Sequence, residues 1–380
     1  MVGEKAGGVV DWLIYDLKIP YGPAATQYPD HSANRQLGVT GRSVNWLKLM
    51  SQKLNENGGK IMTDTRAQEF IRDKAGNVVG VKATMTNGQK IDFSAKSVVL
   101  ASGGYGANRA MLPKKVASYL FYGLDSETGD GLAMGKKIGA GTINLDLVKQ
   151  YPQGVETLPH HALAATASST DTMKKSGAIY VNRDGKRIVD ELAGLGTLTK
   201  ITEAQKDSIM YIVMDKAAWK QYVAKSLEDK LVAAPSDLDK WAKIVNNGYP
   251  VMATSAKLAD AAKTMGINAK GLQATIDRWN GFVKAGADKD FGRKVLMPFG
   301  EGPYYIVEQK PRFQTTLGGL KANADMQILN KKGQPIGNLF GAGCVVGGAN
   351  GSDSLTAMMN SWAIISGVVA GDSAVKNLKK

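Results

Sequence analysis

The 380-residue chain has few of the residues from which disulfides and metal centres are built. Cys344 is its only cysteine, which excludes a disulfide within the chain and a zinc site made of cysteines. The three histidines, His31, His160 and His161, are too few for a centre built on histidine. We therefore expect no metal ion, while a single cysteine leaves the redox compartment open.

Long apolar runs and clustered positive charge are also missing. No apolar stretch approaches 18 residues, and no basic segment followed by an apolar one marks a signal peptide, so a cytoplasmic protein without a membrane span is the default expectation. The formal charge is +14, but lysines and arginines occur in runs of at most two. Without a nucleic-acid-binding motif, scattered solvated side chains explain this charge, and nucleic acid is not an expected partner.

Glycine, in contrast, is abundant, with 44 residues in 380, against an average near 7%. Glycines gather after apolar segments, in SGGYGAN (102–108), SETGDG (126–131) and GAGCVVGGANG (341–351). A glycine turn after a strand lets backbone N–H groups approach a phosphate or a flavin without obstruction by Cβ. These segments predict ligand-binding turns, although the last has no charged neighbour closer than Asp353.

The order of expected elements changes twice along the chain. Helices over 8–17 and 43–56 precede a strand meander that ends in a buried strand at 97–100 and a helix near Asn108. The middle of the chain combines a hairpin at 177–191 with strands and amphipathic helices, and a last helix is expected over 354–377. The sequence thus predicts three segments, namely 1–145, an α+β insertion at 146–316, and 317–380, which rejoins the first.

Four stretches together resemble one known family, the fumarate reductase/succinate dehydrogenase flavoproteins and in particular the soluble flavocytochrome-type reductases. They are KSVVLASGGYGANRAML (96–112), SETGDGLAMGKKIGAGTINLD (126–146), GAIYVNRDGKRIVDE (177–191) and TLGGLKANADMQILNKKGQPIGNLFGAGCVVGG (316–348). The resemblance covers most of residues 10 to 380. It implies an α/β fold in which an FAD-binding, glutathione-reductase-like domain carries an inserted α+β capping domain.

The FAD-binding domain is expected to be incomplete. The family begins with a G-x-G-x-x-G turn that holds the pyrophosphate of the cofactor, and no such motif lies ahead of residue 40. A fragment, one half of a split protein and a natural truncation with weakened FAD binding all remain open at this point. The last two allow a separate N-terminal chain or electron-donor chain as a partner.

The resemblance also implies which residues contact FAD. Asp130, at the start of a helix, either caps that helix or accepts a hydrogen bond from a ribityl or ribose hydroxyl. Cys344 stands where the family has a glutamate, and without a nearby cation it is expected to be an unreactive apolar residue. The full expected set is Ala67, Ala101, Ser102, Gly103, Gly104, Thr128, Gly129, Asp130, Gly318, Gly319, Gly343, Cys344, Ser354 and Leu355.

The catalytic pattern of the family is largely lost. In the family, one arginine delivers a proton and histidines with a second arginine hold the substrate carboxylates. The matching positions here are Tyr151, Leu195, Gln314, Thr315 and Ser354. Losing these groups should abolish dicarboxylate reduction, because an unpaired, desolvated charge costs several kcal/mol.

Thr170 and Asp171 alone fit the family's "TE" pair, with Asp for Glu. Tyr151 with an acidic residue at 171 is similar to the urocanate-reductase branch, although that branch keeps the arginines that are missing here. We take Tyr151, Thr170 and Asp171 as catalytic candidates. His160, His161 and Arg312 are further candidates, for which an exposed position on the surface is the expected alternative.

Two functions follow from the resemblance. The first is an FAD-dependent oxidoreductase that acts on CH–CH bonds and passes hydride between flavin N5 and an unsaturated small molecule other than fumarate. The second is a non-catalytic or split-subunit remnant of the family, with impaired FAD binding. A yellow preparation with about one FAD per chain would favour the first.

Overall fold

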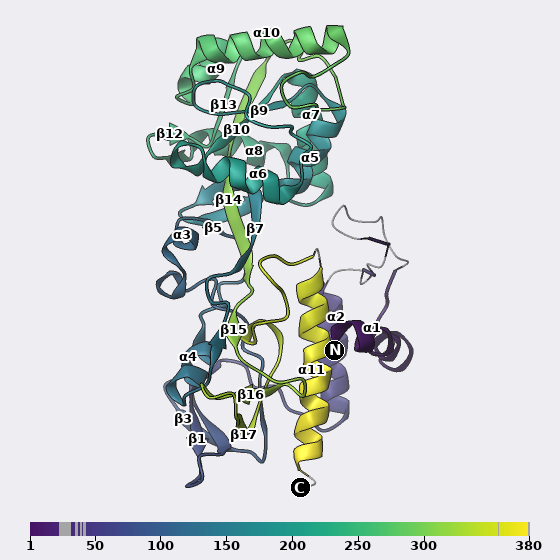
Figure 1. The fold of residues 1–380 in the computed structure, drawn as a ribbon, viewed down its shortest axis with the longest axis vertical. Coiled ribbons are helices and arrows are strands. Elements are labelled where there is room, and N and C mark those ends of the chain that lie inside the picture. The colour runs from purple at the N-terminus through teal and green to yellow at the C-terminus, as the bar shows by residue number, and fades with distance from the viewer. Residues whose placement is uncertain (23–31, 35–36, 39, 41–42, 356, 379–380) are drawn as a thin grey trace. The chain divides into compact units, whose positions relative to one another are not determined.

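The computed structural model describes residues 1–22, 32–34, 37–38, 40, 43–355 and 357–378 (Figure 1). The chain forms two compact units. Unit 1 consists of residues 1–117, 123–149 and 315–380, and unit 2 consists of residues 118–122 and 150–314. Because segments far apart in the sequence return to unit 1, the glycine turns near residues 103, 129 and 343 belong to the same unit.

Unit 1 contains three small sheets. The meander β1–β2–β3 is antiparallel, and left-handed glycines, Gly76 and Gly88, form its two turns as the sequence predicted. A second sheet has the order β16-β17-β4, and β15 pairs with β6. The strands are β1 (Thr65–Arg72), β2 (Val78–Met85), β3 (Lys90–Ser94), β4 (Val98–Leu100), β6 (Thr142–Ile143), β15 (Gly319–Leu320), β16 (Gln327–Leu329) and β17 (Pro335–Gly341).

The helices of unit 1 pack largely around one apolar cluster. Val9, Leu13, Ile19 and Ile365 form its centre, so that α1 and α11 lie together and side chains of α2 pack against them (Figure 1). The helices are α1 (Val2–Asp11), a π-helical turn (Trp12–Asp16), α2 (Ser43–Glu56), α3 (Lys114–Ala117), α4 (Asp130–Lys137) and α11 (Met358–Asn377).

Two expectations for unit 1 are wrong, and the expected last helix is confirmed to Asn377 with a later start. The buried strand at 97–100 is only partly buried, with Val99 40% exposed, because β4 ends the sheet order β16-β17-β4. The helix near Asn108 is a single 3-10 turn, since the residue before Pro113 is extended. The last helix begins at Met358 rather than residue 354, after Ala357 in the left-handed region.

Unit 2 is built on a seven-stranded sheet. Its order is β5-β8-β7-β14-β10-β9, β13 also pairs with β14, and a further pairing of β5 with β14 closes four strands into a small barrel. The strands are β5 (Leu120–Phe121), β7 (Val148–Leu158), β8 (His161–Ala164), β9 (Ile179–Val181), β10 (Met210–Met214), β13 (Met252–Ser255) and β14 (Tyr304–Thr316). A separate hairpin joins β11 (Val245–Asn246) to β12 (Tyr249–Pro250).

Helices cover both faces of this sheet. Met210, Ile212 and Met214 of β10 enter one core with α5 to α8, whereas Tyr211 and Val213 enter another with α9 and α10, as the period of two in a strand requires. The helices are α5 (Thr166–Lys175), α6 (Leu195–Glu203), α7 (Lys216–Glu228), α8 (Pro235–Asp239), α9 (Leu258–Thr264) and α10 (Ala269–Ala285).

A buried ionic cluster joins the 177–191 segment to α10 and the loop that follows it. Glu191 accepts hydrogen bonds from Arg187 (2.7 Å) and from Arg293 (3.2 Å), and Arg187 also pairs with Asp288. Arg293 is fully buried and donates further bonds to the backbone carbonyls of Met173, Ser176 and Ala178. The acidic end of the predicted hairpin motif is therefore a structural anchor of unit 2.

Candidate functional site: glycine turns of unit 1 and a buried arginine of unit 2

The turn after β4 contains two glycines, and the second, Gly104, packs against the hydroxyl of Thr316. Gly103 has a φ of +76°, which favours glycine. A Cβ on Gly104 would lie 2.4 Å from Oγ1 of Thr316 and 3.3 Å from Oε2 of Glu127. The glycines after the strand are therefore needed where two polar side chains approach the chain.

The second turn begins helix α4. Gly129, with a φ of +77°, is the N-cap of this helix, so the expectation that Asp130 caps it is wrong. Asp130 is instead the first helical residue, and its carboxylate accepts two hydrogen bonds from Arg66, of 2.6 and 2.8 Å. This partly exposed pair holds β1 against α4, and the pKa of Asp130 lies below its usual range chiefly through that bond.

The third group of glycines places backbone directly on backbone. A Cβ on Gly319 would lie 2.4 Å from the carbonyl oxygen of Val345 and 2.7 Å from the nitrogen of Gly347. Gly343 is left-handed, donates its N–H to Ser366 and accepts a bond from the indole of Trp362. Helix α11 therefore fixes the turn that follows β17, without any charged side chain.

Glu127 and Thr316 lie beside the turn at Gly104, and Glu127 is close enough to Cys344 for its charge to act on that thiol. Oε2 of Glu127 and Oγ1 of Thr316 are both buried, and neither has a hydrogen-bond partner among the residues that the structure describes. Burial raises the pKa of Glu127 to about 7. Burial and the charge of Glu127 raise the pKa of Cys344 to about 12, so Cys344 carries a neutral thiol at neutral pH, in line with the unreactive role expected for it.

The pH dependence of stability tests the state of Glu127. Its carboxyl keeps a proton up to about pH 7 in the folded chain but loses it near the ordinary value of 4.5 when unfolded, so stability falls as pH rises between these values. Because glutamine cannot ionise, we expect Glu127→Gln to raise the melting temperature relative to the parent chain at pH 8, and to differ less at pH 5.

The matched control for this experiment is Glu69→Gln. Glu69 is exposed on β1, and its hydrogen bond with Lys137 holds the pKa of that carboxyl below its usual range. The difference between parent and variant should then be small and of opposite sign, with the parent favoured at high pH. A Glu127→Gln variant whose stability follows the parent at both pH values would contradict the buried, protonated carboxyl.

The donor set in unit 1 suits a flavin nucleotide. Glycine N–H groups, a hydroxyl and a carboxyl that can be protonated or ionised near neutral pH complement the polar edge and the sugar-alcohol chain of such a cofactor. The two buried polar atoms that have no partner among the described residues, on Glu127 and Thr316, are the observation that indicates a ligand here. Sequence reasoning named neither as a site residue, although Glu127 lies within the SETGDG stretch and Thr316 begins the stretch at 316–348.

The remaining expected FAD contacts differ in exposure. Ala67 is exposed on β1, and Ala101 and Ser102 are exposed in the turn after β4. Thr128 is half-buried directly before Gly129. Gly318 is packed against backbone, because a Cβ there would lie 2.0 Å from the carbonyl oxygen of Asn144. Ser354 is buried and donates to the carbonyl of Leu355, whose side chain is exposed.

The catalytic candidates lie in unit 2, on β7 and α5. Tyr151 lies on β7, with its ring 4.3 Å from the guanidinium carbon of Arg312. Thr170 and Asp171 lie in α5, where Asp171 forms an ion pair with Lys175 at 3.0 Å. Arg312 on β14 links the two elements, because it donates to the carbonyl of Gln153 in β7 and to the hydroxyl of Thr166, the first residue of α5. His160 and His161 are exposed, as the alternative interpretation expected, and His31 lies outside the described residues.

Arg312 is buried, so the expectation of a surface arginine is wrong. Only 3% of this residue is exposed, because β14 runs through the centre of the sheet and has strand neighbours on both sides. At the positions expected for family cations, Gln314 is exposed and Leu195 begins α6. Arg312, the buried cation of this strand, therefore lies two residues before Gln314, which matches a histidine of the family.

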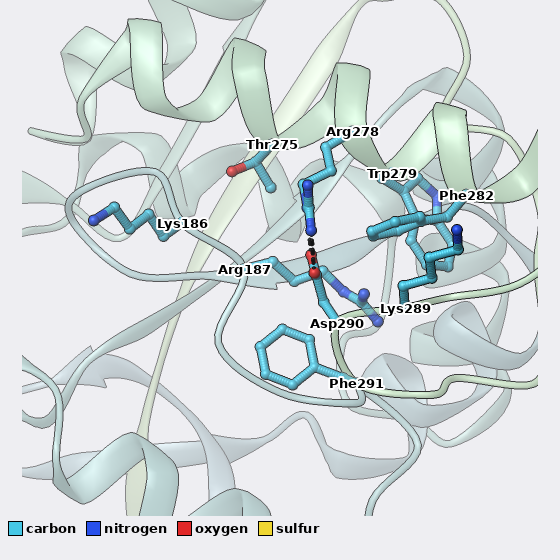
Figure 2. Close-up of a pocket in the computed structure, with 9 residues that line it drawn as sticks. All are labelled: Lys186, Arg187, Thr275, Arg278, Trp279, Phe282, Lys289, Asp290 and Phe291. Carbon is cyan, nitrogen blue, oxygen red and sulfur yellow. Dashed lines mark hydrogen bonds and ion pairs between the residues drawn. The ribbon is translucent and has the colours of Figure 1, made fainter.

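A separate cavity of about 420 Å³ opens in unit 2 (Figure 2). Arg278 in it forms an ion pair with Asp290, and Arg187 stacks over Trp279 and Phe291 while paired to Glu191. None of the catalytic candidates lines it. The lining residues are Lys186, Arg187, Thr275, Arg278, Trp279, Phe282, Lys289, Asp290 and Phe291.

Two classes of site are absent from the described part of the chain. No group of three or more His, Cys, Asp or Glu side chains in residues 1–22, 32–34, 37–38, 40, 43–355 and 357–378 is placed to hold a metal ion. Within the same ranges, no helix combines the length and the apolar character needed to cross a membrane.

The glycine turns and the buried polar atoms of Glu127 and Thr316 lie together in unit 1, and the fold is that of an α/β flavoprotein. The family model of the FAD binding domain matches residues 18–358, and the chain belongs to this family of fumarate reductase/succinate dehydrogenase flavoproteins, whose cofactor is FAD.

Named relatives and a solved structure agree with this assignment. Urocanate reductase of Eggerthella lenta is 31% identical over 98% of this chain and 60% of its own length. Fumarate reductase (cytochrome) of Shewanella frigidimarina is 29% identical over 92% of this chain and 57% of its own length. The open conformation of a flavocytochrome c3 fumarate reductase matches with a TM-score of 0.79 at 25% identity, over 99% of this chain and 63% of that one. The chain thus spans about 60% of the length of these relatives.

Proposed function

We propose that the chain is the flavin-binding and substrate-binding part of an FAD-dependent oxidoreductase that acts on an unsaturated small molecule other than fumarate. Unit 1 then corresponds to an incomplete, glutathione-reductase-like FAD-binding domain, and unit 2 to an inserted α+β capping domain. The carrying observation is the pair of buried polar atoms on Glu127 and Thr316, which lie beside the Gly103–Gly104 turn without partners among the described residues.

The residues of unit 1 would hold the cofactor in three ways. Backbone N–H groups of the turns at residues 103–104, 318–319 and 343 would donate to it, and Thr316 would add a hydroxyl. Glu127, with a pKa near 7, would donate or accept according to its protonation. When bound, FAD supplies the hydride-accepting and hydride-donating centre of the reaction, at N5.

The substrate class is inferred from the names of the relatives and from the uncharged residues at positions where the family has substrate-clamping groups. Urocanate and fumarate, which appear in the relatives' names, are both unsaturated carboxylates. Fumarate carries two carboxylates, and the positions of the family's clamping groups hold Tyr151, Thr315 and Ser354 here. Since an unpaired buried charge costs several kcal/mol, a substrate with fewer negative charges fits this chain better.

Tyr151 is the proposed proton-transferring residue, with Thr170 and Asp171 as supporting residues on α5. A positioned general acid typically contributes 10²- to 10⁴-fold to a rate. We therefore expect Tyr151→Phe to lower the rate of urocanate reduction by about that factor, with little change in FAD content. The assay follows anaerobic oxidation of reduced methyl viologen by the FAD-loaded chain after addition of trans-urocanate.

A second tyrosine of unit 2 provides the control. Tyr249, on β12, stacks on Arg183, and Tyr249→Phe removes a hydroxyl from unit 2 without touching Arg312. The rate of this variant should stay within about twofold of the parent rate. A Tyr151→Phe variant with the parent rate would remove Tyr151 from the proposal.

A non-catalytic remnant is the second candidate, favoured by the uncharged residues at the family's cationic positions. Flavin content and turnover separate it from the first. A chain that stays colourless after incubation with FAD, or a yellow chain that reduces neither urocanate nor other unsaturated carboxylates, would support the remnant.

A further inference from the structure

Arg312 is held in an unusual environment inside unit 2. Its guanidinium carbon lies 4.4 Å from the ring centroid of Tyr122 and 4.3 Å from that of Tyr151. Nε donates to the carbonyl oxygen of Gln153 at 3.2 Å, and Nη2 donates to Oγ1 of Thr166 at 2.9 Å. Nη1 is buried and has no partner among the described residues.

The charge of Arg312 is not balanced in the way that other buried arginines of unit 2 are. Arg187 and Arg293 both pair with Glu191. For Arg312, no carboxylate in the described part of the chain lies within 4 Å of the guanidinium nitrogens. Burial lowers the pKa of Arg312 to about 10, so it remains protonated at neutral pH. Buried cations are normally paired, so this site lacks an anion.

We propose that Arg312 binds the carboxylate of an unsaturated monocarboxylate, with Nη1 as the donor that the protein leaves for it. That this carboxylate belongs to the substrate rests on the function proposed above, whereas the binding of a carboxylate by Arg312 does not. Carboxylates match the planar guanidinium, and the single charge of Arg312 balances one negative charge, whereas the neighbouring Lys310 is already paired with Glu156 and Glu308. This places the anion-binding group two residues before Gln314, the position that matches a histidine of the family motif.

The two tyrosine rings explain how the site is prepared. Contacts with both rings restrain the guanidinium before a ligand arrives, which reduces the entropy lost on binding. Tyr122 is 38% exposed and directly follows the short strand β5, so the Arg312 site lies beneath a residue that reaches the surface of unit 2. Tyr151, the proposed proton donor, then lies against the same guanidinium that holds the ligand.

Binding of trans-urocanate to the full chain without FAD tests the proposal directly. The probes are trans-urocanate, its methyl ester, fumarate and inorganic phosphate, and calorimetry gives the dissociation constants. We expect the parent chain to bind trans-urocanate at least tenfold more tightly than the methyl ester or phosphate, and more tightly than fumarate. Arg312→Met should weaken urocanate binding by about 10- to 100-fold, the value of a charged hydrogen bond.

A comparison with Arg293, which is also buried in unit 2, distinguishes an effect on ligand binding from an effect on folding. Because Arg312 lacks a carboxylate partner, Arg312→Met should melt at or above the parent temperature, whereas Arg293→Met should melt well below it. Trans-urocanate should raise the melting temperature of the parent chain and leave that of Arg312→Met unchanged. If Arg312→Met fails to fold, Arg312→Lys keeps the charge without the planar fork and should weaken urocanate binding several-fold.

Three results would overturn the proposal. The first is that the parent chain binds trans-urocanate and its methyl ester equally tightly. The second is that it binds phosphate as tightly as trans-urocanate. The third is that folded Arg312→Met, or Arg312→Lys in its place, binds trans-urocanate as tightly as the parent chain. Each is independent of flavin, since the measurement uses the chain without FAD. A chain that binds urocanate but takes up no FAD would refute the proposed function and leave the Arg312 site intact.

Discussion

Gly319→Val is expected to abolish FAD uptake by the chain. A Cβ at this position would lie 2.4 Å from the carbonyl oxygen of Val345 and 2.7 Å from the nitrogen of Gly347. Both contacts are to backbone, so no side chain can rotate away to make room, and the turn after β17 must move. Flavin absorbance of the purified variant, after incubation with FAD, should fall at least tenfold below that of the parent chain.

The matched control is Gly367→Ala in α11. Nothing lies within 4 Å of a Cβ at Gly367, and alanine replaces glycine inside a helix with a gain of about 1 kcal/mol. This variant should take up as much FAD as the parent and melt at the same or a higher temperature. Normal flavin content in Gly319→Val would show that the turn at residues 343–348 does not hold the cofactor.

Arg293→Met is expected to lower the free energy of unfolding by about 3–5 kcal/mol, the usual cost of breaking a buried ion pair. The substitution leaves Glu191 without one of its two buried arginines and removes the donors to the carbonyls of Met173, Ser176 and Ala178. Urea denaturation followed by circular dichroism measures the effect.

An exposed arginine of α10 provides the comparison. Arg278 pairs with Asp290 and is 61% exposed, and exposed ion pairs contribute at most about 1 kcal/mol. Arg278→Met should therefore shift the urea midpoint slightly. Equal shifts for the two variants would mean that the buried cluster does not anchor unit 2.

Much of the fold is predictable because its signals are local. The helix at 43–56 and the meander with turns at Gly76 and Gly88 follow from apolar spacing and from glycine in the left-handed region. Errors arise where one residue changes the local geometry. Pro113 stops the helix expected near Asn108, and a π-helical turn over Trp12–Asp16 ends the helix expected over 8–17.

The candidate sites are less accessible from sequence, because burial and pairing depend on tertiary contacts. Glu127 precedes the TGDG motif and reads as a solvated loop residue until the Gly104 turn is packed against it. Arg312 follows a proline and reads as a surface cation, yet β14 has strand neighbours on both sides. The sequence predicts that Asp130 caps its helix or contacts FAD, but it cannot predict the partner Arg66, which is 64 residues away in the chain.

Fluorescence titration of the purified chain with FAD tests the central claim most directly. The glycine turns and the buried polar atoms of Glu127 and Thr316 predict saturable quenching of flavin fluorescence at about one FAD per chain. They also predict that Gly367→Ala retains this binding and that Gly319→Val loses it. Quenching that does not saturate in the parent chain, or equal FAD binding in Gly319→Val, would contradict a flavin site built from these turns.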